Sequence, residues 1–152
     1  MRALVQRAMG AQVVIDGRSP EGFEGPGLVV LIGVTHSDDA DTARRLASKI
    51  LQLRIFTSPE HAAERSAAEL QLPLLAISQF TLYADTSKGR RPSWNAAAPG
   101  EIAEPLFDAC IDELRALGAE VSTGVFGAQM RVQFTNDGPI TILLELDPLP
   151  PK

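Results

Sequence analysis

Two hydroxyl groups and a carboxamide lie together in the segment Ser78-Gln79-Phe80-Thr81, directly after the apolar run Leu74–Ile77. The run is typical of a buried strand, and polar groups at the end of such a strand cost roughly 2–7 kcal/mol unless they find hydrogen-bond partners. One interpretation is that these side chains bind the neighbouring backbone. The other is that they face a ligand, which makes the segment the first candidate for a reactive site.

Other chemistries find little support in the sequence. His36 and His61 fit no metal-binding spacing, and no H-E-x-x-H pattern, G-x-S-x-G elbow, P-loop or dinucleotide fingerprint is present. The single cysteine, Cys110, falls in a helical pattern, which favours a small core residue over a nucleophile and excludes an intrachain disulfide. We therefore expect a protein without a metal or a cofactor.

The composition is that of an ordinary globular protein. The 152 residues are 45% hydrophobic and 22% charged, with a net charge of −5, which argues against a general nucleic-acid coat protein with a basic face. It leaves room for a local basic cluster at Lys88, Arg90 and Arg91. Because the sequence shows no cleavable signal pattern and no apolar run of about 18 residues, we expect a cytoplasmic protein that does not enter a membrane.

Hydrophobic patterning predicts a single domain over residues 1–147 and a flexible tail over residues 148–152. Strands are expected at Ala3–Met9, Gln12–Asp16, Leu28–Val34, Arg54–Phe56, Leu74–Ile77, Glu120–Gly124, Met130–Thr135 and Pro139–Leu146. Helices are expected at Ser37–Leu53, capped by Ser37 or Asp38, and at Ala103–Leu117, ended by Gly118. Since two amphipathic helices need a sheet to cover, the prediction is an α+β fold: a curled, barrel-like β-sheet covered by two main helices.

The segments between these elements carry their own predictions. Ser19–Gly27 is rich in glycine and proline and is expected to be mostly turn, and Thr57–Gln71 is expected to be a loop or a short helix. Asp85–Pro99 is a long connection without apolar period, and connections of this length in compact domains are often functional. Asn136-Asp137-Gly138 lies between two expected strands, which predicts a hairpin turn.

Several segments, taken in order, resemble the D-aminoacyl-tRNA deacylase family. They are MRALVQRA, GPGLVVLIGV, KILQLRIF, SQFTLYADTSKGRRPSW, GVFGAQM and NDGPITILLE, and together they cover nearly the whole chain. One segment departs from the family pattern: TSPEHAAERSAAELQLPL stands where many members have a glycine-lysine-methionine-asparagine loop. The departure bears on the geometry of that loop and leaves the signature motifs intact.

The resemblance implies an enzyme that hydrolyses the ester joining a D-amino acid, or glycine, to the 3′ adenosine of tRNA, as a proofreading step of translation. It implies a catalytic segment at Ser78, Gln79, Phe80 and Thr81, and substrate contacts at Gly138, Pro139, Phe126, Met130 and Arg7. In the family the Gly-Pro bond is cis and enters the pocket of a partner subunit, which implies a homodimer that excludes L-aminoacyl-tRNA. Taken alone, the Gly-Pro pair reads as an ordinary turn, Phe126 and Met130 as core residues, and Arg7 as solvent-facing or structural.

The chemistry of these residues is compatible with ester hydrolysis. An aminoacyl ester is already reactive, so holding it beside a water molecule supplies about 7–11 kcal/mol and one oxyanion donor about 2.7–4 kcal/mol. Thr81 has no neighbouring base in the sequence, which favours an orienting role over a nucleophile, with the backbone N–H groups of Phe80 and Thr81 as donors. If Ser78 and Thr81 both reach the ligand, the strand must bulge or end there. The alternatives are a non-catalytic dimeric β-barrel that binds RNA ends or small amines, and a general esterase or amidase.

Overall fold

The computed structural model describes residues 1–150, except for the side chains of Ser58 and His61, so the end of the expected tail lies outside the described residues. Its elements are β1 (Arg2–Val14), β2 (Glu21–Gly33), α1 (Ala40–Gln52), β3 (Arg54–Ser58), β4 (His61–Ser66), α2 (Ala67–Leu70), β5 (Leu74–Ser78), the 3₁₀ helix η1 (Phe80–Tyr83), α3 (Gly100–Ala116), β6 (Val121–Thr123) and β7 (Arg131–Glu145). Five strands form one sheet in the order β6-β5-β2-β1-β7, while β3 and β4 pair separately.

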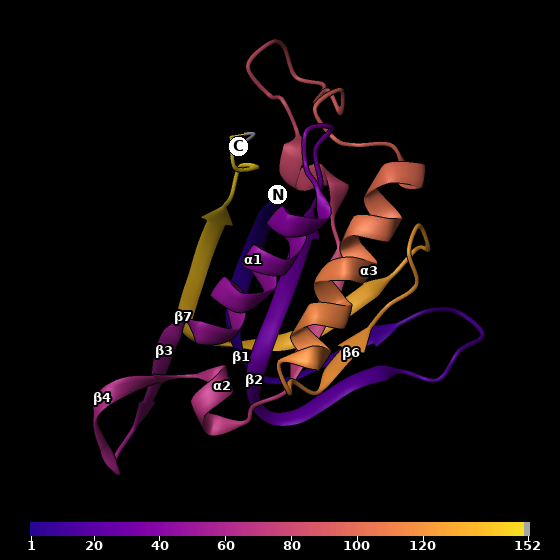
Figure 1. The fold of residues 1–152 in the computed structure, drawn as a ribbon. Coiled ribbons are helices and arrows are strands. Elements are labelled where there is room, and N and C mark those ends of the chain that lie inside the picture. Colours follow the sequence, from indigo (N-terminus) through magenta and orange to yellow (C-terminus); the bar gives the residue numbers. More distant parts are fainter. Residues whose placement is uncertain (151–152) are drawn as a thin grey trace.

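The two long helices lie side by side on one face of the sheet (Figure 1). The apolar run in β2 is buried at the centre of the sheet, where it pairs with β1 antiparallel and with β5 parallel. Leu46 and Ile50 of α1 and Leu114 of α3 are fully buried against that face, together with Cys110. Burial raises the pKa of the Cys110 thiol to about 12, so this cysteine is a core residue, as its helical spacing indicated.

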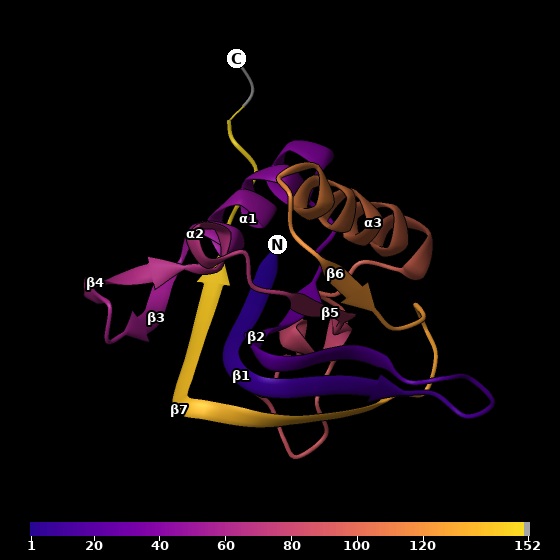
Figure 2. The same ribbon diagram turned by 90° about the horizontal axis from the view of Figure 1, so that it is seen from below.

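The sheet is strongly curled. Figure 2 shows β1 and β7 turning together about midway. The pairing of β1 with β2 and with β7 shifts between Met9 and Ala11. Gly10, with a φ of 71°, lies between these two residues. The bend folds the second half of β1 and the first half of β7 over the other face of the sheet and forms a second buried cluster, which includes Val13, Val29 and Ile77. The expected α+β fold with a curled sheet and two main helices is confirmed, although β6 and β7 end the sheet without pairing to each other.

The hairpin expected at Asn136-Asp137-Gly138 is wrong. Both flanking segments belong to one strand, β7, and both pair with β1, from Arg2 opposite Glu145 to Val14 opposite Arg131. Between the pairs Gln6–Thr141 and Ala8–Asn136, one residue of β1 faces four residues of β7. The four residues 137–140 therefore bulge out of a continuous strand instead of reversing the chain.

Three other local expectations need correction. The segment expected to be turn over Ser19–Gly27 holds the first half of β2, which pairs with β1 from Val13 opposite Glu21. Thr57–Gln71, expected to be a loop or a short helix, does contain a short helix, α2, but most of it forms the end of β3 and all of β4. The two expected first strands are one strand, β1, because Gly10 bends the chain without ending the pairing.

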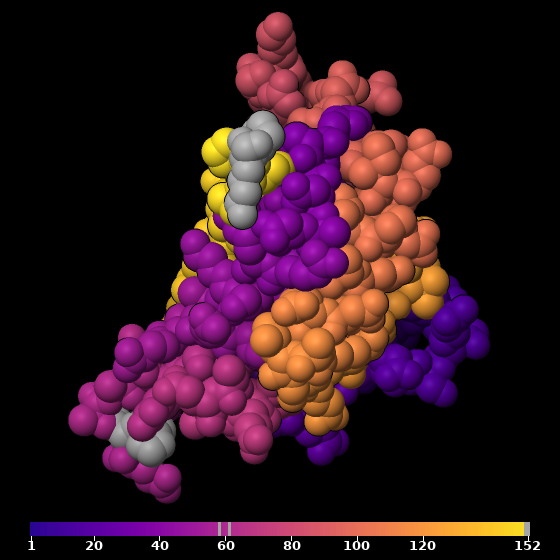
Figure 3. All heavy atoms as spheres, viewed as in Figure 1, coloured from indigo at the N-terminus to yellow at the C-terminus, as the bar shows by residue number. Residues whose placement is uncertain are grey.

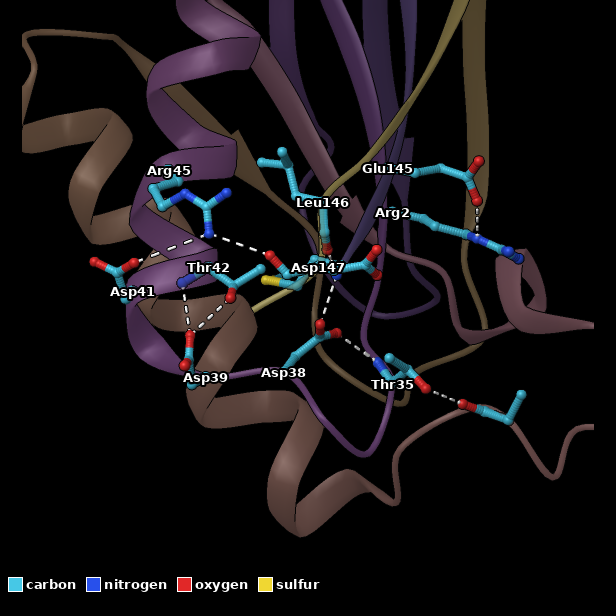
Figure 4. Close-up of polar contacts among 12 residues, drawn as sticks. Arg2, Thr35, Asp38, Asp39, Asp41, Thr42, Arg45, Glu145, Leu146 and Asp147 are labelled. Carbon is cyan, nitrogen blue, oxygen red and sulfur yellow. Dashed lines mark hydrogen bonds and ion pairs between the residues drawn. The ribbon is translucent and has the colours of Figure 1, made fainter. Parts of the chain in front are cut away.

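The start of α1 and the N-terminus share one polar cluster (Figure 4). The helix is capped by Asp39, whose side chain accepts from the N–H of Thr42, and not by Ser37 or Asp38. Asp38 instead turns inward: its carboxylate lies 2.6 Å from the ammonium nitrogen of Met1 and accepts from the N–H of Thr35 at 2.7 Å. The Met1–Asp38 ion pair is buried, and it holds the connection between β2 and α1 against the residue that precedes β1.

The connection between η1 and α3 and the β3–β4 hairpin both project from the body of the molecule. Figure 3 shows the chain between η1 and α3 rising at the top, and the β3–β4 hairpin extending at the lower left. The first is the long connection Asp85–Pro99, which has no regular element apart from single bridges at Asp85–Ser93 and Thr35–Ala97. Within residues 1–150, no helix combines the length and the hydropathy needed to cross a lipid bilayer.

Candidate active site at the end of strand β5

The polar segment Ser78–Thr81 lies where a buried strand ends and a helical turn begins. Leu74–Ile77 are buried in β5, which ends at Ser78, and Gln79 then leaves the strand with φ −141° and ψ 83° before η1 starts at Phe80. The N–H of Gln79 donates to the carbonyl oxygen of Ile32 at 2.7 Å, so the neighbouring strand β2 fixes the point of departure. The strand therefore ends at the position where, according to the sequence analysis, it must bulge or end if Ser78 and Thr81 are both to reach a ligand.

A pocket of about 390 Å³ opens beside this strand end, within the size range of small-molecule sites. One wall consists of Ser78, Gln79 and Phe80. Its lining also includes Ala103 and Phe107 of α3 and the connection that contains residues 126–130. Of the nine residues that the sequence proposed for the site, the pocket thus brings together Ser78, Gln79, Phe80, Phe126 and Met130.

The hydroxyl group of Thr81 has an amide as its side-chain partner. The side-chain nitrogen of Gln79 donates a hydrogen bond to Oγ1 of Thr81, and no histidine, lysine or carboxylate of the described residues contacts that oxygen. An amide is not a base, so this arrangement orients the hydroxyl group and does not activate it as a nucleophile.

The backbone of the same turn offers donors. The first N–H groups of a helix lack partners within it, and in η1 the N–H groups of Phe80 and Thr81 have no acceptor among the described residues, whereas that of Leu82 donates to Gln79. Phe80 lines the pocket and Thr81 follows it outside the lining; two neighbouring free N–H groups so close to a pocket are suited to a developing oxyanion.

Phe126 and Met130 line the pocket and also pack against the core clusters, so the core role is confirmed and the substrate contact stays a prediction. The Phe126 ring lies 6.4 Å from that of Phe107, centroid to centroid, at a tilt of 56°. Met130 passes over Gly124 so closely that a Cβ atom there would overlap its sulfur. Gly124 is therefore a positioning residue that the sequence patterning did not reveal.

Two further residues missed from the sequence hold η1 in place. A Cβ atom on Gly33 would lie 3.0 Å from the carbonyl oxygen of Gln79 and 3.1 Å from the Cβ of Leu82. Arg2 donates to the carbonyl oxygen of Leu82 at 2.8 Å, and its guanidinium lies 4.5 Å from the centroid of the Tyr83 ring. Burial raises the pKa of Tyr83 to about 12. For Gly33 the sequence held one signal. It is a glycine inside an apolar strand, and such a glycine often marks the close approach of another backbone segment.

The remaining candidates, Arg7, Gly138 and Pro139, lie away from the pocket. Gly138 and Pro139 are exposed in the bulge of β7, and the bond between them is cis. Arg7 donates from Nε to the carbonyl oxygen of Asp137 at 3.0 Å and from Nη1 to that of Ile55 at 2.7 Å, so it is a structural contact of the bulge. Within one protomer, the structure does not bring the bulge to the Ser78–Thr81 segment.

Residues suited to a metal ion do not cluster. In residues 1–150, side chains of His61 and Ser58 aside, no three histidine, cysteine, aspartate or glutamate residues are placed to hold one ion. Nε2 of His36 lies 2.9 Å from the carbonyl oxygen of Asn95, on the surface.

Sequence comparisons find relatives that match nearly the full length of this chain. The family model described as D-Tyr-tRNA(Tyr) deacylase matches residues 4–145. The D-aminoacyl-tRNA deacylase of Nocardia farcinica is 60% identical over 147 residues, covering 95% of this chain and 99% of that protein. That of Streptomyces coelicolor is 57% identical over 146 residues, covering 96% and 100%, and that of Mycobacterium tuberculosis is 56% identical over 147 residues, covering 95% and 99%.

Solved structures share the fold. A c-Myc DNA unwinding element binding protein superposes with a TM-score of 0.87 at 35% identity, covering 97% of this chain and all of that one. A probable eukaryotic D-amino acid tRNA deacylase gives a TM-score of 0.83 at 18% identity, covering 95% of this chain and 98% of that one, which shows a common fold. Since the family model spans most of the chain and the relatives exceed half identity, the protein belongs to the D-Tyr-tRNA(Tyr) deacylase family, as its motifs indicated.

Proposed function

We propose that the protein hydrolyses the ester of D-aminoacyl-tRNA, and of glycyl-tRNA, to free amino acid and tRNA in the cytoplasm, as a proofreading step of translation. The observation that carries the proposal is the free N–H of Phe80, which lines a pocket of about 390 Å³, followed directly by the free N–H of Thr81. Family membership supplies the substrate class.

The reaction needs little from any side chain acting as a nucleophile. Water adds to the ester carbonyl carbon, the bond from that carbon to the ribose 3′ oxygen breaks, and this oxygen leaves with a proton. The N–H groups of Phe80 and Thr81 stabilise the negative charge on the carbonyl oxygen, and the neighbouring ribose 2′ hydroxyl helps to activate the water. Thr81, bonded to the Gln79 amide, keeps the turn in shape.

In the proposed homodimer, the bulge of one subunit completes the pocket of the other and selects the D configuration. Gly138 and Pro139 are exposed and lie outside their own pocket. Three leucines form an apolar row on the face of the sheet away from the helices. Leu4 lies in the middle, opposite Leu31 on one side and Leu143 on the other. Leu143 is 51% exposed, so burial of this row against a second copy would be favourable.

A deacylation assay on three substrates tests the activity. D-Tyr-tRNA is expected to be hydrolysed, whereas L-Tyr-tRNA and a simple aryl ester are not. Cleavage of the simple ester would indicate a general esterase, and binding of tRNA without turnover would indicate a non-catalytic binding protein. Thr81→Ala is expected to keep measurable activity, because an orienting group is lost and the N–H donors stay; complete loss with intact substrate binding would favour a threonine nucleophile.

A mixed dimer of two variants, one with a blocked pocket and one that should reject L-Tyr-tRNA less well, tests the cross-subunit pocket. Ser78→Phe fills the pocket, and the double variant Gly138→Ala, Pro139→Ala alters the bulge, because a Cβ on Gly138 would lie 2.9 Å from the nitrogen of Ile140. If the bulge acts in trans, the one working pocket of the heterodimer receives the intact bulge, so D-Tyr-tRNA is hydrolysed with the wild-type preference over L-Tyr-tRNA. If the bulge acts within its own chain, the working pocket keeps the altered bulge, and the heterodimer shows the weakened rejection of L-Tyr-tRNA of the double variant.

One structural relative is named for binding a DNA element, which gives a second candidate function. The net charge of −5 argues against duplex binding by this chain, because affinity for a duplex depends on neutralising phosphates with cations. A gel-shift titration with duplex DNA beside the deacylation assay separates the two functions.

A further inference from the structure

The loop that follows η1 carries three cations on a closed turn. Asp85 and Ser93 exchange backbone hydrogen bonds of 2.8 and 2.9 Å, which closes the seven residues between them into a loop that projects from the molecule (Figures 1 and 3). Lys88, Arg90 and Arg91 lie within this loop and are all exposed. Three positive charges within four residues are therefore held at one site on an acidic protein.

These cations have no partner among the described residues, unlike most others of the chain. Ion pairs with carboxylates are made by Arg2, Arg7, Arg45, Arg65 and Arg131. Arg54 and Arg115 donate to backbone carbonyl oxygens. The carboxylate nearest in sequence to the cationic loop is that of Asp85. Hydrogen bonds from the side chain and the N–H of Ser87 lower its pKa.

An aromatic pair connects the loop to the pocket. Trp94 follows the closing residue of the loop, and its ring meets that of Phe80 edge to face, with centroids 5.3 Å apart at 77°. Both rings are large apolar groups in contact with water, at 42% and 55% exposure. Phe80 also lines the pocket, so the path from pocket to loop passes over two aromatic rings and reaches the cations.

We infer that the Phe80–Trp94 pair and the loop of Lys88, Arg90 and Arg91 bind the single-stranded 3′ end of the tRNA on its way to the pocket. Aromatic rings on which bases stack, next to cations that contact phosphates, are the features by which proteins hold single strands. The inference rests on the proposed function: with the terminal adenosine in the pocket, the preceding nucleotides must leave over the rim. A duplex partner is disfavoured because only a single strand offers free base faces to the two rings.

Two matched triple variants test the cationic loop. Lys88→Ala, Arg90→Ala, Arg91→Ala removes the three charges, and Arg18→Ala, Arg44→Ala, Lys49→Ala removes the same residue types from exposed positions without partners elsewhere. For the loop variant, we expect KM for D-Tyr-tRNA to rise and the slope of log(kcat/KM) against log[salt] to become shallower by about 2, since each phosphate contact to a single strand contributes about 0.7. The control variant should keep the wild-type slope.

Trp94 is the single tryptophan of the chain, so its fluorescence reports on the aromatic pair directly. Titration with a short single-stranded RNA that ends in the tRNA 3′ sequence is expected to quench it, and duplex DNA of equal charge is not. Trp94→Ala should raise KM for D-Tyr-tRNA roughly 5- to 150-fold, as expected from loss of one stacking contact, and Trp94→Phe should restore most of the loss.

A truncated substrate separates this inference from the proposed function. D-Tyrosyl-adenosine lacks the phosphates and the preceding bases, so it reports on the pocket alone. If the wild-type protein hydrolyses neither substrate, the proposed function fails. If it hydrolyses both substrates, the proposed function holds. If the loop variant and Trp94→Ala then show the wild-type KM and salt slope with D-Tyr-tRNA, the inferred binding of the tRNA 3′ end is overturned. Quenching by duplex DNA instead of single-stranded RNA would also overturn it.

Discussion

The guanidinium group of Arg7 binds Asp137 twice: Nε donates to the backbone oxygen at 3.0 Å and lies 3.3 Å from the carboxylate. Its other contact, the carbonyl oxygen of Ile55, belongs to the β3–β4 hairpin. The Arg7 side chain is only 13% exposed, so it links the bulge of β7 to the hairpin from inside the molecule. The hairpin, in which this sequence departs from the family pattern, is thereby part of what holds the bulge.

Arg7→Ala is expected to lower the free energy of unfolding by about 1–3 kcal/mol and to weaken the preference for D- over L-Tyr-tRNA. The reason is that two backbone oxygens lose a charged donor and the bulge loses its anchor. Deacylation of both substrates and urea unfolding measure the two effects. Arg54→Ala, which removes an exposed arginine bonded to the Glu64 carbonyl oxygen, is the control. An unchanged D-to-L ratio in Arg7→Ala would contradict the anchoring role.

Gly33→Ala is expected to reduce kcat about tenfold, because the new Cβ would press on Gln79 and Leu82 at 3.0–3.1 Å and displace η1 by a few tenths of an ångström. The overpacking should also cost about 1–3 kcal/mol of stability. Gly100→Ala is the matched control, since its Cβ would make an ordinary contact, 3.6 Å from the Phe126 ring. Single-turnover rates with D-Tyr-tRNA give the comparison; equal rates for both variants would show that η1 tolerates the shift.

What the sequence predicted correctly came from strong local patterns. The stripe that includes Phe107, Ile111 and Leu114 predicted α3, and the glycine that follows, Gly118, ends it with a φ of 94°. The run Leu74–Ile77 predicted a buried strand because an apolar run of this length needs burial on both faces. The ordered motifs identified the family.

The wrong hairpin expectation has a physical cause, which is pairing between residues far apart in the sequence. Asn136-Asp137-Gly138 carries a hairpin signal, yet the chain on both sides of it finds its partner in β1, from 117 residues away (Val14 with Arg131) to 143 (Arg2 with Glu145). The meeting of Phe80 with Trp94, and of Gly33 with Gln79, likewise depends on how η1 folds back. Neither spacing nor composition contains that information.

Asp38→Ala is expected to lower the free energy of unfolding by about 3–5 kcal/mol. Its carboxylate is fully buried against the Met1 ammonium, and removing it leaves an uncompensated charge as well as a Thr35 N–H without its acceptor. Asp41→Asn is the control, because Asp41 is 60% exposed and lies 4.0 Å from Arg45; it should cost less than about 1 kcal/mol. Urea unfolding at pH 7 distinguishes the two, and similar losses would mean that the ammonium finds another partner.

The carboxylate of Glu69 closes the capping box at the start of α2. It accepts from the N–H of Ser66 at 2.8 Å and from Arg65 at 2.8 Å, and these bonds lower its pKa from 4.5 to about 2. A carboxyl group with a lowered pKa in the folded state contributes stability above its unfolded pKa. That contribution is lost as the pH falls from about 4.5 toward 2.

Glu69→Gln is therefore expected to flatten the decline of stability between pH 4.5 and 2, because the amide cannot titrate. Guanidinium unfolding at several pH values, for the wild type, for Glu69→Gln and for Glu104→Gln on the exposed face of α3, measures the effect. The control should keep the wild-type slope. Ser66 ends β4, and β4 pairs with β3, which contains the Ile55 carbonyl oxygen that Arg7 binds. Acid should therefore loosen the bulge along with the hairpin. A Glu69→Gln slope equal to that of the wild type would show that the capping box forms independently of the Glu69 charge.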